Sequence, residues 1–123
     1  MSATVIGAVA LFFLGMGVLG LVAPATLIRP FGIELTVPEA RAEVRAVYGG
    51  FGVATGVLLC WAATLAGDGD LRRGIAVAVA VALGGMALGR LAARLVERPS
   101  RFYPSWFYFW VEVVGAGLLM LAG

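Results

Sequence analysis

Hydrophobic positions along this chain fall into four long blocks, separated by short stretches that hold polar and helix-breaking residues. Residues 3–23 form the first block, an uncharged run of 21 residues. A helix needs about 20 residues at ~1.5 Å each to cross a hydrocarbon core of ~30 Å. Together the blocks predict helices at about 3–23, 38–67, 72–96 and 104–122.

The stretches between the blocks indicate where the helices turn. Pro24 and Pro30 break the pattern after the first block, which is typical of a connection at the headgroups. Thr36 followed three residues later by Glu39 matches a capping box and predicts a helix start. The sequence GDGDLRR at 67–73 predicts a tight polar turn. Short loops between long helices favour an all-α fold, an up-down bundle of four transmembrane helices.

Composition supports one membrane domain covering residues 1–123. Hydrophobic residues make up 62% and charged residues 13%, against roughly 45–50% and about 25% in soluble domains. There is no His and only one cysteine, Cys60, so the usual ligands of a transition metal are missing and no cofactor is expected. The net charge of +2 provides no basic patch, so nucleic acid is not an expected partner.

Small residues predict where helices come close together. Gly52 with Gly56, and Gly85 with Gly89, form two GxxxG pairs of the kind that lets helix backbones approach in a membrane. These glycine-rich faces predict close packing either within the chain or between subunits. The expected partners are therefore membrane lipid and either further copies of this chain, in a homo-oligomer, or a larger membrane complex.

Three charged residues occur inside or beside the apolar blocks. In an up-down bundle Arg45, Arg90 and Glu112 lie at comparable depth on one side of the membrane. An unpaired charge at such depth costs on the order of 2.5–3.5 kcal/mol, so each should face inward and find a partner. The expected partner of Glu112 is either Arg45 or Arg90.

Helical spacing adds neighbours to these charges. Tyr48 shares a face with Arg45, Arg94 with Arg90, and Tyr108 with Glu112. Arginine presents a planar fork of donors suited to carboxylate or phosphate, and arginine outnumbers acid at this depth. The pattern predicts a ligand-binding site for an anionic amphiphile, such as a lipid, a fatty acid or a quinone-like molecule. Its residues are Arg45, Tyr48, Arg90, Arg94, Tyr108 and Glu112.

Two other interpretations stay open. The buried charges are equally suited to act as a latch that fixes helix packing, in an accessory or structural subunit of a larger membrane complex. In an intramembrane enzyme, Glu112 would be the general acid or base. No nucleophile, metal or cofactor motif accompanies it, so we favour a protein without catalytic residues. Aromatic residues at 102–110 are typical of an interfacial belt.

Three stretches also carry a family resemblance: RAEVRAVYGGFGVATGVLL at 41–59, Gly89-Arg90, and RPSRFYPSWFYFWVEVVGAGLL at 98–119. Through them the chain resembles the domain-of-unknown-function family 4345 of small bacterial membrane proteins and, more distantly, the DoxX-like proteins. The resemblance implies a four-helix protein of the bacterial inner membrane and implies no activity. The DoxX-like proteins suggest quinone or thiol redox partners, and this chain has no paired cysteines for the latter.

The distribution of arginine predicts an orientation in the bacterial inner membrane. Segments 24–45 and 90–105 together carry seven arginines, whereas the opposite turn carries only Arg72 and Arg73. Cytoplasmic loops of membrane proteins are enriched in basic residues. We therefore expect segments 24–45 and 90–105 in the cytoplasm and both termini on the other side.

Overall fold

The computed structural model describes residues 2–65, 69–97, 104 and 106–122. All regular secondary structure in this part of the chain is helical, which confirms the prediction of an all-α fold there. Three helices within it are long and apolar enough to cross a membrane, and a fourth apolar helix is shorter. The three long spans are Ala3–Val22, Pro38–Ala63 and Asp70–Val96, and the shorter helix is Phe107–Ala122.

The first long helix leads into a short crossing segment. Helix α1 (Ser2–Val22) ends just before Pro24, which occupies the first position of α2 (Pro24–Ile28) and needs no N–H there. The 3₁₀ turn η1 (Arg29–Phe31) follows directly. Gly32 ends the segment at a φ of 76°, a left-handed conformation that glycine adopts without a Cβ clash. We call α2 and η1 together the crossing segment.

The second long helix consists of three consecutive elements. They are α3 (Pro38–Val44), the π-helical turn η2 (Arg45–Gly50) and α4 (Phe51–Ala63). The residues at both junctions keep right-handed helical dihedral angles, so the chain axis continues without a break. The predicted span beginning at residue 38 is therefore one helix that is wound more widely at η2.

The start of this helix differs from the predicted capping box. Pro38 is its first residue, as the sequence pattern suggests, but the N-cap is Val37 in an extended conformation, and no side chain caps the helix. Thr36 therefore lies one position too early to accept from the first turn. Because a capping box requires its first residue at the N-cap, Thr36 and Glu39 do not form one.

The last two helices form a pair. Helix α4 ends at Ala63, before the predicted end, and the hydroxyl of Thr64 donates to the carbonyl of Trp61 at 2.6 Å in the turn. Helix α5 (Asp70–Val96) then returns along its full 27 residues. Helix α6 (Phe107–Ala122) has 16 residues and packs along α5.

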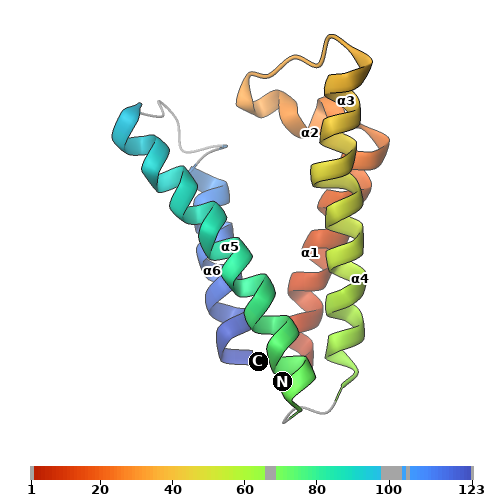
Figure 1. Ribbon diagram of the computed structural model, residues 1–123, viewed down its shortest axis with the longest axis vertical. Coiled ribbons are helices and arrows are strands. Elements are labelled where there is room, and N and C mark those ends of the chain that lie inside the picture. The colour runs from red at the N-terminus through yellow and green to blue at the C-terminus, as the bar shows by residue number, and fades with distance from the viewer. Residues whose placement is uncertain (1, 66–68, 98–103, 105, 123) are drawn as a thin grey trace.

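The four main helices are arranged as two pairs, α1 with α4 and α5 with α6 (Figure 1). The pairs lie close together at the start of α1 and the end of α6, and they diverge toward the end that carries α2 and α3. Ile6, Leu59 and Leu119, from three different helices, are 0% exposed and belong to one hydrophobic cluster. The core therefore joins the pairs at their converging end.

Glycines bring α1 and α4 into backbone contact. A Cβ placed on Gly52 would lie 2.8 Å from the Cα of Gly17, and one on Gly56 would meet the side chain of Leu14 at 2.6 Å. The first GxxxG pair therefore packs within the chain. A Cβ on Gly85 or Gly89 would meet no atom within 4 Å, so the second pair lies on an open face of α5.

Candidate functional site

A buried ion pair joins the two helices of the second pair. Glu112, in α6, is only 3% exposed. Its Oε1 accepts from Nε of Arg90 at 2.8 Å, and its Oε2 accepts from Nη2 of Arg90 at 3.1 Å. This two-bond arrangement is the strong form of an arginine–carboxylate contact. Of the two partners left open for Glu112 by the sequence, the structure pairs it with Arg90.

Two aromatic rings lie beside the guanidinium group. Its central carbon lies 5.7 Å from the ring centre of Phe31 and 5.5 Å from that of Tyr108, distances at which a cation is attracted by the ring face. The two rings are stacked, with centres 5.6 Å apart and planes at 28°. Phe31 belongs to the crossing segment, so Arg90 connects this segment to α5 and α6.

A cavity of about 30 Å³ adjoins the ion pair, enough for about one water molecule. Arg90, Glu112 and Tyr108 line it together with Tyr48, which η2 supplies. A π turn is wound more widely than an α turn and occurs mostly as a single turn at functional sites. The remaining lining is mainly apolar: Phe12, Phe13, Met16, Leu27, Ile28, Phe31, Leu83, Met86 and Val111.

The structure gathers four of the six predicted site residues around this cavity and places two elsewhere. Arg45 is exposed and donates from Nε to the carbonyl of Leu21 at 3.1 Å, in the last turn of α1. The negative end of the helix dipole favours a cation there. Arg94 lies one turn beyond Arg90 and does not line the cavity. With Arg45 and Arg94 elsewhere, Arg90 and Glu112 remain at the cavity, and together they are formally neutral.

The sequence did not predict the contact of Phe31 with Arg90 or the burial of Arg72. Phe31 lies in a segment that reads only as a connection, and no local signal marks its contact with Arg90. Arg72 reads as part of a polar turn, but it is 5% exposed. Its spacing to Ala76, Val79 and Leu83 along α5, which places all four on the buried stripe, was the available signal.

Arg72 is incompletely satisfied at the other end of α5. Its Nη1 donates to the carbonyl of Leu65 at 3.1 Å. Its Nε and Nη2 are buried and have no hydrogen-bond partner among the residues that the structure describes. Buried donors without partners raise the free energy of the folded state.

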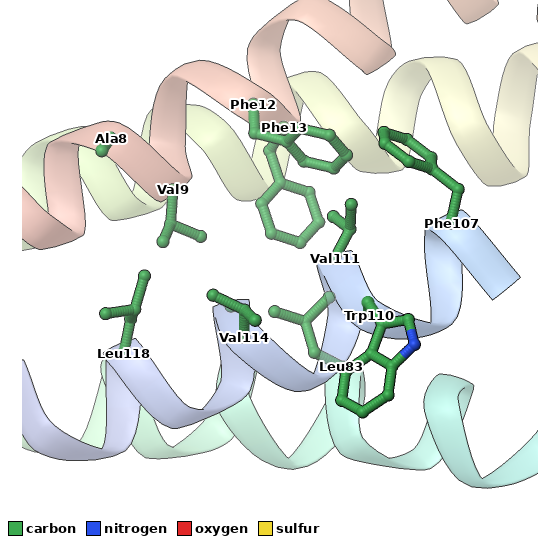
Figure 2. Close-up of a pocket in the computed structure, with 11 residues that line it drawn as sticks. Ala8, Val9, Phe12, Phe13, Leu83, Phe107, Trp110, Val111, Val114 and Leu118 are labelled. Atoms are coloured by element: carbon green, nitrogen blue, oxygen red, sulfur yellow. The ribbon is translucent and has the colours of Figure 1, made fainter.

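Two apolar grooves adjoin the small cavity beside the ion pair. The first, between α1 and α6, has a volume of about 410 Å³ and we call it the α1/α6 groove (Figure 2). Side chains from both helices point into it, among them Val9, Phe13 and Leu118. Its full lining is Ala8, Val9, Phe12, Phe13, Leu83, Phe107, Trp110, Val111, Val114, Gly115 and Leu118.

The second groove lies on the other side, between α4 and α5, and we call it the α4/α5 groove. Its volume is about 400 Å³. Phe13 and Leu83 line both grooves and the small cavity between them. The remaining lining of the α4/α5 groove is Phe51, Thr55, Leu58, Ala78, Val79, Ala82 and Met86.

The described chain is thus an all-helical protein with three membrane-length apolar helices and a buried ion pair beside a small cavity that two apolar grooves adjoin. The family model described as Domain of unknown function (DUF4345) matches residues 1–122, and the chain belongs to this family. The match confirms the resemblance to the domain-of-unknown-function family 4345. Comparisons with curated proteins and with solved structures gave no match.

Proposed function

We propose that the chain is an integral membrane protein with four spans, in which Arg90 binds the head group of an anionic amphiphile. Residues Arg72 and Arg90 are 18 positions apart on α5, so their Cα atoms are separated by about 27 Å along the helix. This separation is close to the ~30 Å thickness of a hydrocarbon core. Both arginines then lie near an interface, one on each side.

The outer surface of the helices supports the membrane assignment. Large hydrophobic side chains are exposed on all four main helices, including Leu11 at 68%, Trp61 at 50%, Leu88 at 66% and Leu121 at 88%. In water such a surface would associate or aggregate, whereas in a bilayer it contacts acyl chains. Helix α6 has 16 residues, about 24 Å by helical rise, and forms the fourth span in this proposal.

The observation that carries the ligand proposal is the unused edge of Arg90. Glu112 occupies the side edge formed by Nε and Nη2. None of the described residues accepts from Nη1, and the side chain is 22% exposed. A guanidinium has five N–H donors, so an end-on edge formed by Nη1 and the second hydrogen of Nη2 is left for a carboxylate or phosphate.

The ion pair with Glu112 also holds the guanidinium of Arg90 in a fixed orientation. Without a partner, Arg90 would carry an uncompensated charge at the membrane's edge and its side chain would be free to turn away. Glu112 compensates this charge and fixes the plane of the fork by two hydrogen bonds. A positioned donor set binds an anion with less loss of conformational entropy than a mobile one. Arg94, one turn further on, adds positive charge on the same side of the bilayer.

Native mass spectrometry of the protein, extracted in mild detergent, tests this proposal. We expect the wild-type protein to retain an anionic lipid or fatty acid, and a double variant with Arg90→Leu and Glu112→Leu to lose it. The double variant leaves no buried carboxylate without a partner, so it should still fold. Arg73→Leu removes an exposed arginine from the same helix and serves as the matched control. Equal ligand retention in the double variant and the control would exclude Arg90 as the binding residue.

A latch in an accessory subunit is the second candidate. The observation that favours it is the two-bond contact itself, because it fixes α5 to α6 without any ligand. In that case the double variant changes thermal stability and leaves ligand content unaltered. Extraction from native membranes would then yield a partner protein in fixed stoichiometry.

A further inference from the structure

Both apolar grooves adjoin the small cavity that Arg90 and Glu112 line, because each shares lining residues with it. Phe13 and Leu83 form the partition between the grooves, and they are only 4% and 5% exposed. Because these two side chains fill the space between the helix pairs, one continuous chain does not pass from one groove to the other. The small cavity beside Arg90 adjoins the partition, since the same two residues line it.

Both grooves run along the helices toward their middle. Along α5, the α4/α5 groove covers Met86 to Ala78, which lie about 6 and about 18 Å from Arg90 by helical rise. Along α6, the α1/α6 groove reaches Leu118, about 9 Å beyond Glu112. Half of a hydrocarbon core is about 15 Å thick. The grooves thus follow the direction of acyl chains, and the α4/α5 groove reaches about 3 Å beyond the middle of the core.

The volumes of the grooves favour two equal apolar groups. At about 410 and 400 Å³ the grooves are nearly the same size, and each is within the roughly 300–1,000 Å³ that is typical of ligand sites. A fatty acid or a single-tailed quinone would occupy only one of the two grooves. A diacyl lipid has two similar chains joined at one polar group, which matches two grooves that adjoin one cavity lined by a single arginine.

We propose that the ligand is a diacyl lipid with an anionic head group, with its phosphate at the end-on edge of Arg90 and one acyl chain in each groove. This inference rests on the function proposed above and names the ligand class of the same site. At the α1/α6 groove, Phe107 and Trp110 lie on the first turn of α6, where aromatic side chains favour the level of the head groups.

Substitutions that fill one groove at a time test the proposal. Val114→Trp projects into the α1/α6 groove, and Ala82→Trp projects into the α4/α5 groove. Both positions are exposed, so a larger side chain does not disturb the core. Val113→Trp and Val81→Trp are matched controls, because these exposed neighbours on α6 and α5 line neither groove.

Binding of three probes to the purified, delipidated protein is measured by native mass spectrometry: dioleoyl phosphatidylglycerol, its single-chain lyso form, and oleate. We expect each groove variant to weaken binding of the diacyl lipid by about tenfold or more. The controls should bind as the wild type does. The single-chain probes should bind more weakly and respond to no more than one groove variant.

The outcomes separate this inference from the function on which it rests. If oleate binds as tightly as the diacyl lipid, and only one groove variant weakens either, the two-chain ligand is excluded while binding at Arg90 stands. If the controls weaken binding as much as the groove variants, the grooves are not the chain sites. If the double variant with Arg90→Leu and Glu112→Leu binds the diacyl lipid like wild type, the proposed function itself fails.

Discussion

The two GxxxG pairs look alike in the sequence and differ in their surroundings, so they should respond oppositely to the same substitution. We consider Gly52→Ala in α4 and Gly85→Ala in α5. In each case one methyl group is added to a helix, and the intrinsic gain in helix propensity is the same, about 0.5–1 kcal/mol. Any difference between the variants therefore comes from packing.

At Gly52 the methyl group has no space. It would lie 2.8 Å from the Cα of Gly17, and 3.1 Å from both the nitrogen of Gly17 and the carbonyl oxygen of Phe13. All three are backbone atoms, so no side-chain rotation relieves the contact and α1 must move away from α4. Overpacking of this kind costs about 1–3 kcal/mol. After the propensity gain, we expect Gly52→Ala to lower the free energy of unfolding by about 0.5–2 kcal/mol.

At Gly85 the methyl group meets nothing within 4 Å, so only the propensity gain remains. We expect Gly85→Ala to raise the free energy of unfolding by about 0.5–1 kcal/mol. The assay is reversible unfolding in mixed detergent micelles with increasing dodecyl sulfate, followed by helical ellipticity. Two variants that change stability in the same direction would refute the packing argument. A loss at Gly85 that depends on protein concentration would instead place the open face of α5 against a second copy.

The remaining predictions use the same unfolding assay or chemical labelling. Arg90→Leu alone should lower the free energy of unfolding by about 3–5 kcal/mol, because Glu112 is left buried without its partner. Adding Glu112→Leu should restore most of this stability. A double variant no more stable than the single one would contradict the pairing. Arg72→Leu should raise the free energy of unfolding by about 1–3 kcal/mol, since it removes two buried donors that have no partner among the described residues, while the exposed control Arg73→Leu should change it little. A loss at Arg72 would show that it has a partner. In a cysteine-free background, Glu34→Cys should react with an impermeant maleimide only from the cytoplasmic side, and labelling of intact spheroplasts would reverse the orientation.

Much of the helical framework could be predicted because long apolar runs give a strong signal. The run at 3–23 corresponds to α1, and the run that follows Pro38 corresponds to the second long helix. Depth along a helix depends only on residue count and rise, so the meeting of Arg90 with Glu112 was within reach of the sequence. Which of Arg45 and Arg90 pairs with Glu112 could not be predicted, because it depends on how each helix is rotated about its axis.

Other features depend on tertiary contacts that no local pattern reports. Arg45 turns to the carbonyl of Leu21, which lies 24 residues earlier in the chain. Phe31 reaches Arg90 only because the crossing segment folds over the end of the bundle. A capping box requires its first residue at the N-cap, and Thr36 is displaced by a single residue from that position. Arg72 was misplaced because charged residues beside a turn are usually solvated, whereas α5 begins early enough to bury it.

The carboxylate of Glu112 lies in an apolar helix because it accepts two hydrogen bonds from Arg90 and compensates its charge. A glutamine at position 112 would offer one acceptor and one donor group, and its N–H₂ would face an N–H of the guanidinium instead of accepting from it. Only a carboxylate accepts from Nε and Nη2 together, and only a charged one offsets the cost of the cation at this depth. The same contact leaves the outer edge of the fork without an acceptor among the described residues, beside the small cavity that both grooves adjoin. A latch requires only the two-bond contact between Arg90 and Glu112, whereas ligand binding also requires the free outer edge. Whether a ligand occupies that edge therefore distinguishes the two candidate functions.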